Sequence, residues 1–145
     1  MKPPEITINY KPNLKVSEMK QLNSSEEVAI LLQSIWSDKL QYIEETYLLL
    51  LNRTNHILGY LKLSSGGTAA TIVDVKMIFQ TALKTNSHGI ILAHNHPSSN
   101  LKPSTCDIEL TKKIREAGKL MEIILLDHII LTSESYYSFA DEQML

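Results

Sequence analysis

Residues 90–107 read IILAHNHPSSNLKPSTCD, and their pattern specifies a strand, a loop and a helix in succession. The first four of these residues are apolar, as in a strand that is buried on both faces. Residues 94–103 are mostly polar and contain two prolines, so they predict a loop. A helix then begins at Ser104, and we expect it to end at Gly118 because glycine commonly terminates helices. The strand therefore delivers the polar loop to its own end.

The rest of the chain alternates between strand and helix patterns. Two apolar runs flank the turn-rich residues 52–55 and predict an antiparallel hairpin, whose first strand is apolar on both faces. Apolar residues recur at helical spacing after Ser24 and again after Asp74, and two more apolar runs follow residue 120. Strands that alternate with helices are typical of α/β domains. We expect a mixed sheet, because the hairpin is antiparallel whereas the later strands connect through helices.

The length of 145 residues suits a single hydrophobic core, so we expect one domain over residues 1–145. Residues 41–140 hold the motifs described below. Residues 1–40 are expected to form an N-terminal extension made of a strand and a helix. The strand is predicted over residues 5–10, where apolar and polar side chains alternate as they do in a half-buried strand.

The composition excludes several classes of protein. Lys and Arg number 14 against 16 Asp and Glu, and a net charge of -2 with a pI near 6.2 argues against a dedicated DNA-coating protein. The single cysteine, Cys106, rules out an internal disulfide bond. No apolar run approaches the roughly 20 residues that a membrane helix needs, and the first residues lack a signal-peptide core. We expect a cytoplasmic protein with no membrane contact.

Three residues around the loop suggest a metal site. Since side chains two apart in a strand point to the same side, His94 and His96 can reach one ion. Asp107 lies in the first turn of the following helix, which the loop can fold back onto the strand end. Two imidazoles and one carboxylate leave the fourth tetrahedral position of Zn²⁺ for water, as in catalytic sites. The sequence therefore predicts a zinc ion held by these three residues.

Hydrolysis by such a site needs further groups. Zinc would lower the pKa of its bound water towards roughly 7, and a base must then take the proton. Glu44 or Glu45, at the start of the first hairpin strand, can supply this base. Ser104 precedes Asp107 by three residues and can offer its hydroxyl to the oxyanion of a tetrahedral intermediate.

Each of these residues also has a structural interpretation. Ser104 and Asp107 fit a helix capping box, and an acidic pair before a strand is usually solvated. His128 beside Asp127 is more typical of a hydrogen-bonded structural pair than of a fourth ligand. Cys106 is expected to be a small buried side chain that points away from Asp107. The basic residues around the last long helix are typical of a solvated helix face.

The pattern of His94-x-His96, seven residues, Ser104, two residues and Asp107 resembles the JAMM motif of the JAB/MPN metalloprotease superfamily. Within that superfamily, the sequence at residues 94–98, 103–111 and 126–130 is similar to that of RadC-type proteins. The resemblance covers about residues 40–140. It implies a zinc-binding, three-layer α-β-α domain of the cytidine-deaminase-like kind. It also implies that His94, His96 and Asp107 are the ligands, that Ser104 contacts the oxyanion and that a strand-start glutamate is the base.

The resemblance favours one glutamate and also has departures. Counting back from the turn at residue 52, Glu44 matches the family's glutamate better than Glu45, and only one of two strand neighbours can face the metal. RadC-type proteins usually have glycine where this chain has Ser99, so we expect a change in the path of the loop. Residues 1–40 do not resemble the helix-hairpin-helix half that RadC-type proteins often carry. The His-x-Glu and Cys-x-x-Cys signatures of deaminases are absent from the sequence.

The first hypothesis is a zinc hydrolase that cleaves a peptide or isopeptide bond in a peptide or protein substrate. The alternatives are a nucleic-acid-associated, DNA-repair-related accessory domain and a catalytically dead interaction domain; the intact ligand set disfavours the second of these. DNA binding is expected to be weak, since few phosphate contacts are available. Ser98, Ser99 and Asn100 are expected to line the substrate entrance, where they suit an extended peptide backbone. The motif specifies neither the natural substrate nor the oligomeric state.

Overall fold

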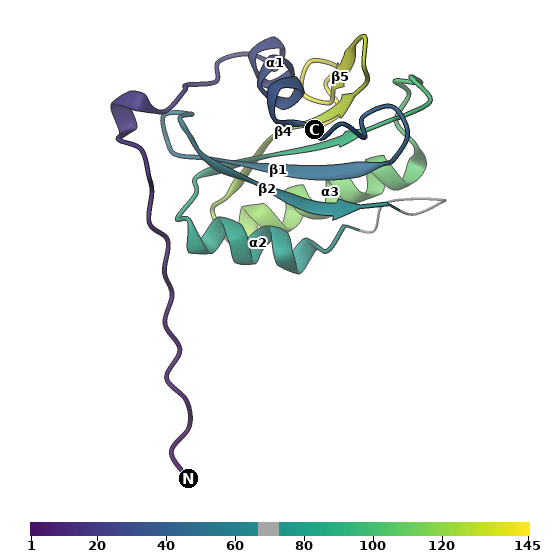
Figure 1. The fold of residues 1–145 in the computed structure, drawn as a ribbon. Helices are drawn as coiled ribbons and strands as arrows, with labels where there is room; N and C mark the ends of the chain where they lie inside the picture. The colour runs from purple at the N-terminus through teal and green to yellow at the C-terminus, as the bar shows by residue number, and fades with distance from the viewer. Residues whose placement is uncertain (67–72) are drawn as a thin grey trace.

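The computed structural model describes residues 1–66 and 73–145. Within these ranges, five strands form one sheet in the order β2-β1-β3-β4-β5: β1 (Glu45–Leu51), β2 (Ile57–Ser65), β3 (Gly89–Asn95), β4 (Ile124–Leu131) and β5 (Tyr136–Ser138). The helices of these ranges are η1 (Val16–Glu18), α1 (Ser25–Ile35), α2 (Val75–Lys84) and α3 (Thr105–Leu120) (Figure 1).

The sheet is mixed, as the sequence predicts. β1 pairs antiparallel with β2 in the expected hairpin, and it also pairs antiparallel with β3. β3 and β4 are parallel, and α3 forms the crossover that two strands of the same direction require. β5 returns antiparallel to β4 at the edge of the sheet.

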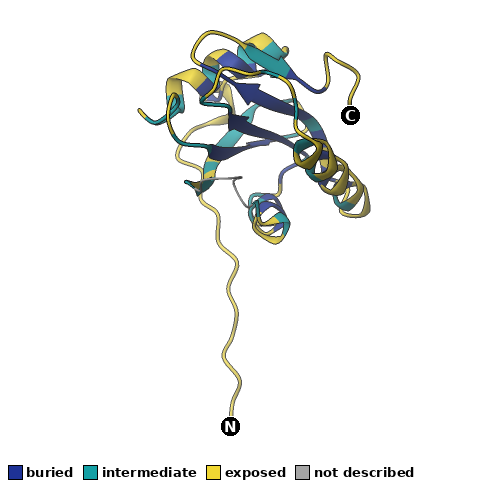
Figure 2. Ribbon diagram, turned by 90° about the vertical axis from the view of Figure 1, so that its right-hand side faces the viewer, coloured by how far each residue is buried: buried dark blue, intermediate teal, exposed yellow. Residues whose placement is uncertain are grey.

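Helices cover both faces of the sheet and produce the expected three-layer α-β-α fold. Tyr47 and Leu49 of β1 pack on one face with α1, whereas Leu48 and Leu50 pack on the other face with α2 and α3. Because successive side chains of a strand alternate between faces, β1 has a core on each side and all of its residues are buried. Figure 2 shows the buried central strands between helices whose outer faces are exposed. The predicted α/β class is confirmed.

α3 continues past Gly118, where the sequence predicts its end, and stops at Leu120. A Cβ atom on Gly118 would lie 2.3 Å from the backbone oxygen of Ile123, just before β4. The left-handed backbone that follows the helix belongs to Glu122, with φ 56°. The glycine is therefore required by the close approach of α3 to the start of β4 and not by helix termination.

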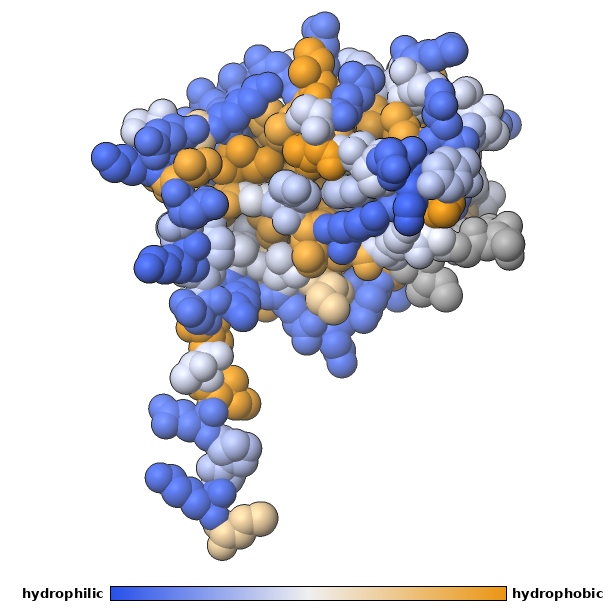
Figure 3. Space-filling view, viewed as in Figure 1, coloured by the Kyte–Doolittle hydropathy of each residue, from blue (hydrophilic) through white to orange (hydrophobic). Residues whose placement is uncertain are grey.

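The strand predicted over residues 5–10 is wrong. The segment is extended and exposed and belongs to none of the described strands, and Ile6 and Ile8 are 86% and 80% exposed. An alternating pattern gives a stable strand only when a neighbouring backbone pairs with it, and no described backbone does so here. The hydroxyl of Tyr10 donates to the backbone oxygen of Leu58, 2.9 Å away. Figure 1 shows the tail leaving the domain, and Figure 3 shows both hydrophobic and hydrophilic residues along it.

The helices of the described ranges are short or polar. α3 is the longest with 16 residues, and its buried positions are Thr111, Ile114 and Gly118. No helix in these ranges combines the length and the apolarity that crossing a membrane requires.

Candidate metal centre

The end of β3 and the first turn of α3 meet at one rim of the sheet. His94 lies near the end of β3, in register with Thr46 of β1 and Ile130 of β4. His96 is the first residue after β3, and the first turn of α3 brings Asp107 to the same place. Ligand atoms of His94, His96 and Asp107 all lie within 4.8 Å of one another. The structure thus brings together the three residues that the sequence predicts as ligands.

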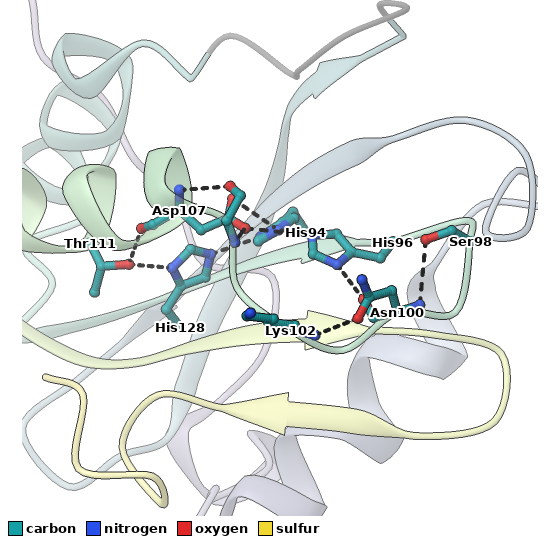
Figure 4. A network of polar contacts seen from close by, with 9 residues as sticks. His94, His96, Ser98, Asn100, Lys102, Asp107, Thr111 and His128 are labelled. Atoms are coloured by element: carbon teal, nitrogen blue, oxygen red, sulfur yellow. Dashed lines mark hydrogen bonds and ion pairs between the residues drawn. The ribbon is translucent and has the colours of Figure 1, made fainter.

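The spacing of the three donors suits a small cation. The Nε2 atoms of His94 and His96 are 2.9 Å apart, and they lie 3.3 Å and 3.5 Å from the two carboxylate oxygens of Asp107 (Figure 4). In a tetrahedral site with Zn–N distances of about 2.0–2.1 Å, ligand atoms stand about 3.3 Å apart. The three donor separations lie at or on either side of this value, so the residues could hold one small metal ion.

The charges of the site favour a cation. Burial opposes the ionisation of Asp107, but its hydrogen bonds with His94 and His96 outweigh that effect and hold the pKa of this carboxyl well below its usual range. The contact with Asp107 raises the pKa of His96 above its ordinary value, against the opposing effect of burial. Both shifts have one cause, the attraction of an anionic carboxylate for positive charge between the imidazoles. A divalent metal ion would supply that charge.

Further hydrogen bonds orient two of the ligands. Nδ1 of His96 donates to the backbone oxygen of Asn100 at 2.5 Å, which leaves the lone pair on Nε2. The backbone N–H of Ser104 donates to Asp107 Oδ2 at 2.7 Å, and the N–H of Asp107 donates to Ser104 Oγ at 3.1 Å. The predicted capping box is therefore present, and it holds the Asp107 carboxylate in the site.

His128 and Thr111 lie behind His94, and the sequence predicted no role at the metal site for either of them. Nε2 of His128 lies 2.8 Å from Nδ1 of His94, and Nδ1 of His128 lies 2.6 Å from Thr111 Oγ1. Burial holds the pKa of His128 well below its ordinary value, so the ring is neutral. The expected hydrogen bond between His128 and Asp127 is present, but it joins the backbone N–H of His128 to the carboxylate, which also accepts from the Ser138 hydroxyl and the Ala140 N–H. The one indication in the sequence of a role at the metal site was that His128 lies within an apolar strand.

The two candidate bases have different surroundings. Glu44 lines a cavity of about 330 Å³ together with the three predicted ligands. Glu45 is fully buried away from this cavity, where it forms an ion pair with Lys62 and accepts hydrogen bonds from the hydroxyls of Ser37 at 2.5 Å and Ser65 at 3.0 Å. The carboxylate of Glu45 is thus committed to structural partners, and that of Glu44 lies beside the metal site.

Asn95 fixes the segment that carries Glu44, and it is a third residue that sequence reasoning missed. Its Nδ2 donates to the backbone oxygens of Leu40 and Ile43 at 2.7 Å and 2.8 Å, and its Oδ1 accepts from the backbone N–H of Glu45 at 2.7 Å. The side chain is fully buried. These bonds tie the start of β1 to the end of β3, so they set the distance between Glu44 and the histidines.

The loop over residues 97–103 forms one wall of the cavity. Ser98, Asn100 and Lys102 line it, whereas Ser99, the third residue predicted for the substrate entrance, does not. Ser99 has φ 63°, in the left-handed region that favours glycine. The serine therefore adopts a backbone conformation of the type that glycine would provide there.

The remaining walls combine polar and apolar side chains. Cys106 is exposed and lines the cavity, so the expectation that it is buried and points elsewhere is wrong; no described segment covers this side of the first turn of α3. Leu92 and Leu110 supply apolar surface. The buried hydroxyl of Thr46 also lies at the cavity and has no hydrogen-bond partner among the described residues.

Comparison with known families is consistent with this geometry. Residues 22–144 match the sequence profile of the family described as RadC-like JAB domain. The match begins before α1 and includes it, whereas the resemblance seen in the sequence begins at about residue 40. α1 is therefore part of the matched domain.

Individual relatives support the same assignment. A UPF0758 protein of Flavobacterium johnsoniae is 41% identical over 127 residues, which are 88% of this chain and 55% of the relative. For a UPF0758 protein of Porphyromonas gingivalis the identity is 43% over 103 residues, with 70% and 45% covered, and for one of Alkaliphilus metalliredigens it is 37% over 127 residues, with 86% and 53% covered. The chain spans about half the length of these relatives. With the profile match over most of its length, it belongs to the RadC-like JAB domain family.

Proposed function

We propose that this chain is a zinc-dependent hydrolase of the JAMM type that cleaves a peptide or isopeptide bond. The convergence of the His94 and His96 imidazoles and the Asp107 carboxylate at one edge of a cavity carries the proposal. Two imidazoles and one carboxylate are a ligand set of catalytic zinc sites. When bound, zinc would polarise the scissile carbonyl and lower the pKa of a water molecule.

The chain's own residues move the protons. Glu44 lies at the cavity, where its carboxylate takes a proton from the attacking water and passes it to the leaving nitrogen. Ser104 Oγ accepts a hydrogen bond from the Asp107 N–H, and its own hydrogen has no acceptor among the described residues. That hydrogen is therefore available to the substrate oxygen as negative charge develops on it.

The walls of the cavity suit an extended polypeptide. Ser98 and Asn100 present hydrogen-bonding side chains on the loop side, and Leu92 and Leu110 present apolar surface. Extended peptides are recognised by main-chain hydrogen bonds together with pockets for side chains. A protein or peptide substrate in the cytoplasm fits these features, because the exposed thiol of Cys106 suits a reducing compartment.

Metal analysis and activity of matched variants test the proposal. Protein purified without added zinc should contain one zinc ion per chain, and His94→Ala, His96→Ala and Asp107→Ala should each lose it. Glu44→Gln should keep zinc and lose hydrolysis of a fluorogenic peptide library and of a lysine-branched isopeptide. Glu109→Gln, on the exposed side of α3, is the control and should keep both. Full zinc content in all three ligand variants, or full activity in Glu44→Gln, would contradict the proposal.

A further inference from the structure

A chain of hydrogen bonds leads from α3 to His94 through buried side chains. Thr111 Oγ1 donates to the backbone oxygen of Asp107, one helical turn earlier, at 2.7 Å. The same Oγ1 lies 2.6 Å from Nδ1 of His128, whose Nε2 lies 2.8 Å from Nδ1 of His94 (Figure 4). Thr111 and His128 are 2% and 0% exposed, so bulk water does not compete for these bonds.

The donor and acceptor of every hydrogen bond in this series follow from the first bond. A threonine hydroxyl has one hydrogen, and Thr111 uses it on the carbonyl of Asp107. Thr111 Oγ1 must therefore accept a hydrogen bond from Nδ1–H of His128. Because a neutral imidazole carries a single N–H, Nε2 of His128 is an acceptor, and the donor opposite it is Nδ1–H of His94.

We infer that Thr111 and His128 form a positioning relay, which fixes the proton of His94 on Nδ1 and thereby directs the Nε2 lone pair at the metal. The inference rests on the metal site of the proposed function, and it assigns these two residues a role towards the metal without contact to it. The relay also links two ligands, because it starts at the backbone of Asp107 and ends at the ring of His94.

The surroundings of His128 hold its ring in place. The ring of Phe139 stacks on it with centroids 4.6 Å apart and planes 12° apart, and the backbone N–H of Phe139 donates to the backbone oxygen of His128 at 3.0 Å. The parallel register of β3 and β4 sets His128 opposite Leu92, two residues before His94. The sheet and the segment after β5 thus both position the relay.

The proton of His96 is also held on Nδ1, but by a different hydrogen bond. His96 Nδ1 donates directly to the backbone oxygen of Asn100 in the loop. That bond depends on local chain conformation, whereas His94 depends on side chains from α3 and β4. A side-chain substitution can therefore disturb His94 and leave His96 unchanged.

Zinc affinity of threonine variants tests the relay. In Thr111→Val, Nδ1–H of His128 loses its acceptor, and the zinc dissociation constant, measured by competition with a chromophoric chelator, should rise about 10- to 100-fold. Thr111→Ser keeps the hydroxyl and should bind zinc like the wild type. Thr81→Val is the matched control, because Thr81 makes the same bond to a carbonyl one turn earlier, that of Met77, on α2. Wild-type affinity in Thr111→Val would overturn the inference.

The proton positions can be observed without any activity assay. Long-range ¹H–¹⁵N correlation spectra of the zinc-loaded full chain should show His128 protonated at Nδ1 and unprotonated at Nε2. Protonation of His128 at Nε2 would overturn the inference, since Nε2 could not then accept from His94.

A double-mutant cycle shows whether the two residues act as one unit. His128→Phe removes both ring nitrogens at similar size, and it should weaken zinc binding about as much as Thr111→Val. Combining the two should add little further loss, because both changes break the same path. Losses that multiply would contradict the relay. Far-UV circular dichroism establishes that each variant is folded.

The inference and the proposed function fail in different ways. If zinc affinity depends on Thr111 and His128 but no peptide or isopeptide is cleaved, the relay is supported and the hydrolase proposal fails. If Glu44→Gln abolishes cleavage while Thr111→Val binds zinc like the wild type, the hydrolase proposal is supported and the relay fails.

Discussion

Glu45 illustrates how one buried carboxylate gains a structural role through its partners. Burial opposes its ionisation, but the contact with Lys62 and the hydroxyls of Ser37 and Ser65 outweigh burial and hold the pKa of Glu45 below its ordinary value of 4.5. A carboxyl group whose pKa is lowered by folding adds stability at higher pH, and this contribution is lost as the pH falls through the folded-state pKa.

Replacing Glu45 should therefore change the pH dependence of stability. The free energy of unfolding of the wild type, measured by urea denaturation, should decrease more steeply between about pH 6 and about pH 3 than that of Glu45→Gln, because the variant lacks the titrating group. At the upper end of this range the variant should be less stable than the wild type, since Lys62 loses its buried partner. Parallel pH profiles for the two proteins would contradict the structural role.

Asn95→Asp should separate metal binding from catalysis. The aspartate lacks the two N–H donors that satisfy the carbonyls of Leu40 and Ile43, and each buried acceptor left unsatisfied costs about 1–3 kcal/mol. The free energy of unfolding should fall by about 2 kcal/mol or more, zinc should be retained, and hydrolysis should drop as Glu44 shifts. Asn9→Asp in the exposed tail should leave all three measurements unchanged.

The left-handed residue of the loop gives another prediction. A left-handed backbone costs a side-chain-bearing residue about 1–2 kcal/mol, and glycine loses about 0.5–1 kcal/mol more conformational entropy on folding. Ser99→Gly should therefore raise the free energy of unfolding by about 0.5 kcal/mol. Ser98→Gly, at a residue without positive φ, should lower it. A decrease in both variants would show that Ser99 is not strained.

At the scale of elements, the contact between α3 and the start of β4 depends on one missing side chain. A Cβ on Gly118 would meet the backbone of Ile123 at 2.3 Å, whereas a Cβ on Gly89 would meet the side chain of Leu126 at 2.6 Å. The side chain of Leu126 can rotate away, whereas the backbone of Ile123, just before β4, cannot. Gly118→Ala should lower the thermal unfolding midpoint more than Gly89→Ala. The added methyl group costs about 1–3 kcal/mol of stability by overpacking, which exceeds what alanine gains in helix propensity. Equal midpoints would contradict this.

Most elements could be predicted from the sequence because their signals are local. The hairpin, the capped helix after Asp74 and the buried strand before His94 each follow from hydrophobic spacing and turn residues. The N-terminal strand could not be excluded in this way, because pairing depends on a partner strand and not on alternation alone. Likewise, Gly118 fits the pattern of a helix end. Glycine is required there because the helix lies against the backbone of Ile123, and sequence spacing does not reveal that contact.

For the molecule as a whole, the spacing of His94, His96 and Asp107 in the sequence was sufficient to predict that these three candidate ligands lie together. The relay was not predictable, because it requires the parallel register that sets β4 beside β3 and places His128 within reach of His94. Asn95 escaped prediction for a related reason, since its partners lie 50 to 55 residues earlier in the chain. Residues that orient others are recognised only when the fold brings distant segments together.

The charge of the whole molecule limits its affinity for nucleic acid. The net charge is -2, and the exposed basic residues Lys112, Lys113 and Arg115 make only one modest cluster on α3, so few phosphate contacts can form. DNA binding should therefore be weak and should fall further as salt increases, as fluorescence anisotropy of a labelled duplex would measure. Dissociation constants below about 1 μM near physiological salt would favour the accessory-domain alternative, since such affinity needs more phosphate contacts.

The three candidate ligands lie within residues 94–107, from the end of β3 to the first turn of α3, whereas Glu44 lines the cavity from the residue before β1. In an evolving lineage, these two parts are therefore exposed to separate losses. Under the proposed function, a substitution at Glu44 would give a domain that binds metal without processing a substrate. A substitution at Asp107 would remove both properties together. Under the proposed function, metal content and catalytic competence would thus be inherited as distinct traits, and the first would outlast the second in a descendant that lost Glu44.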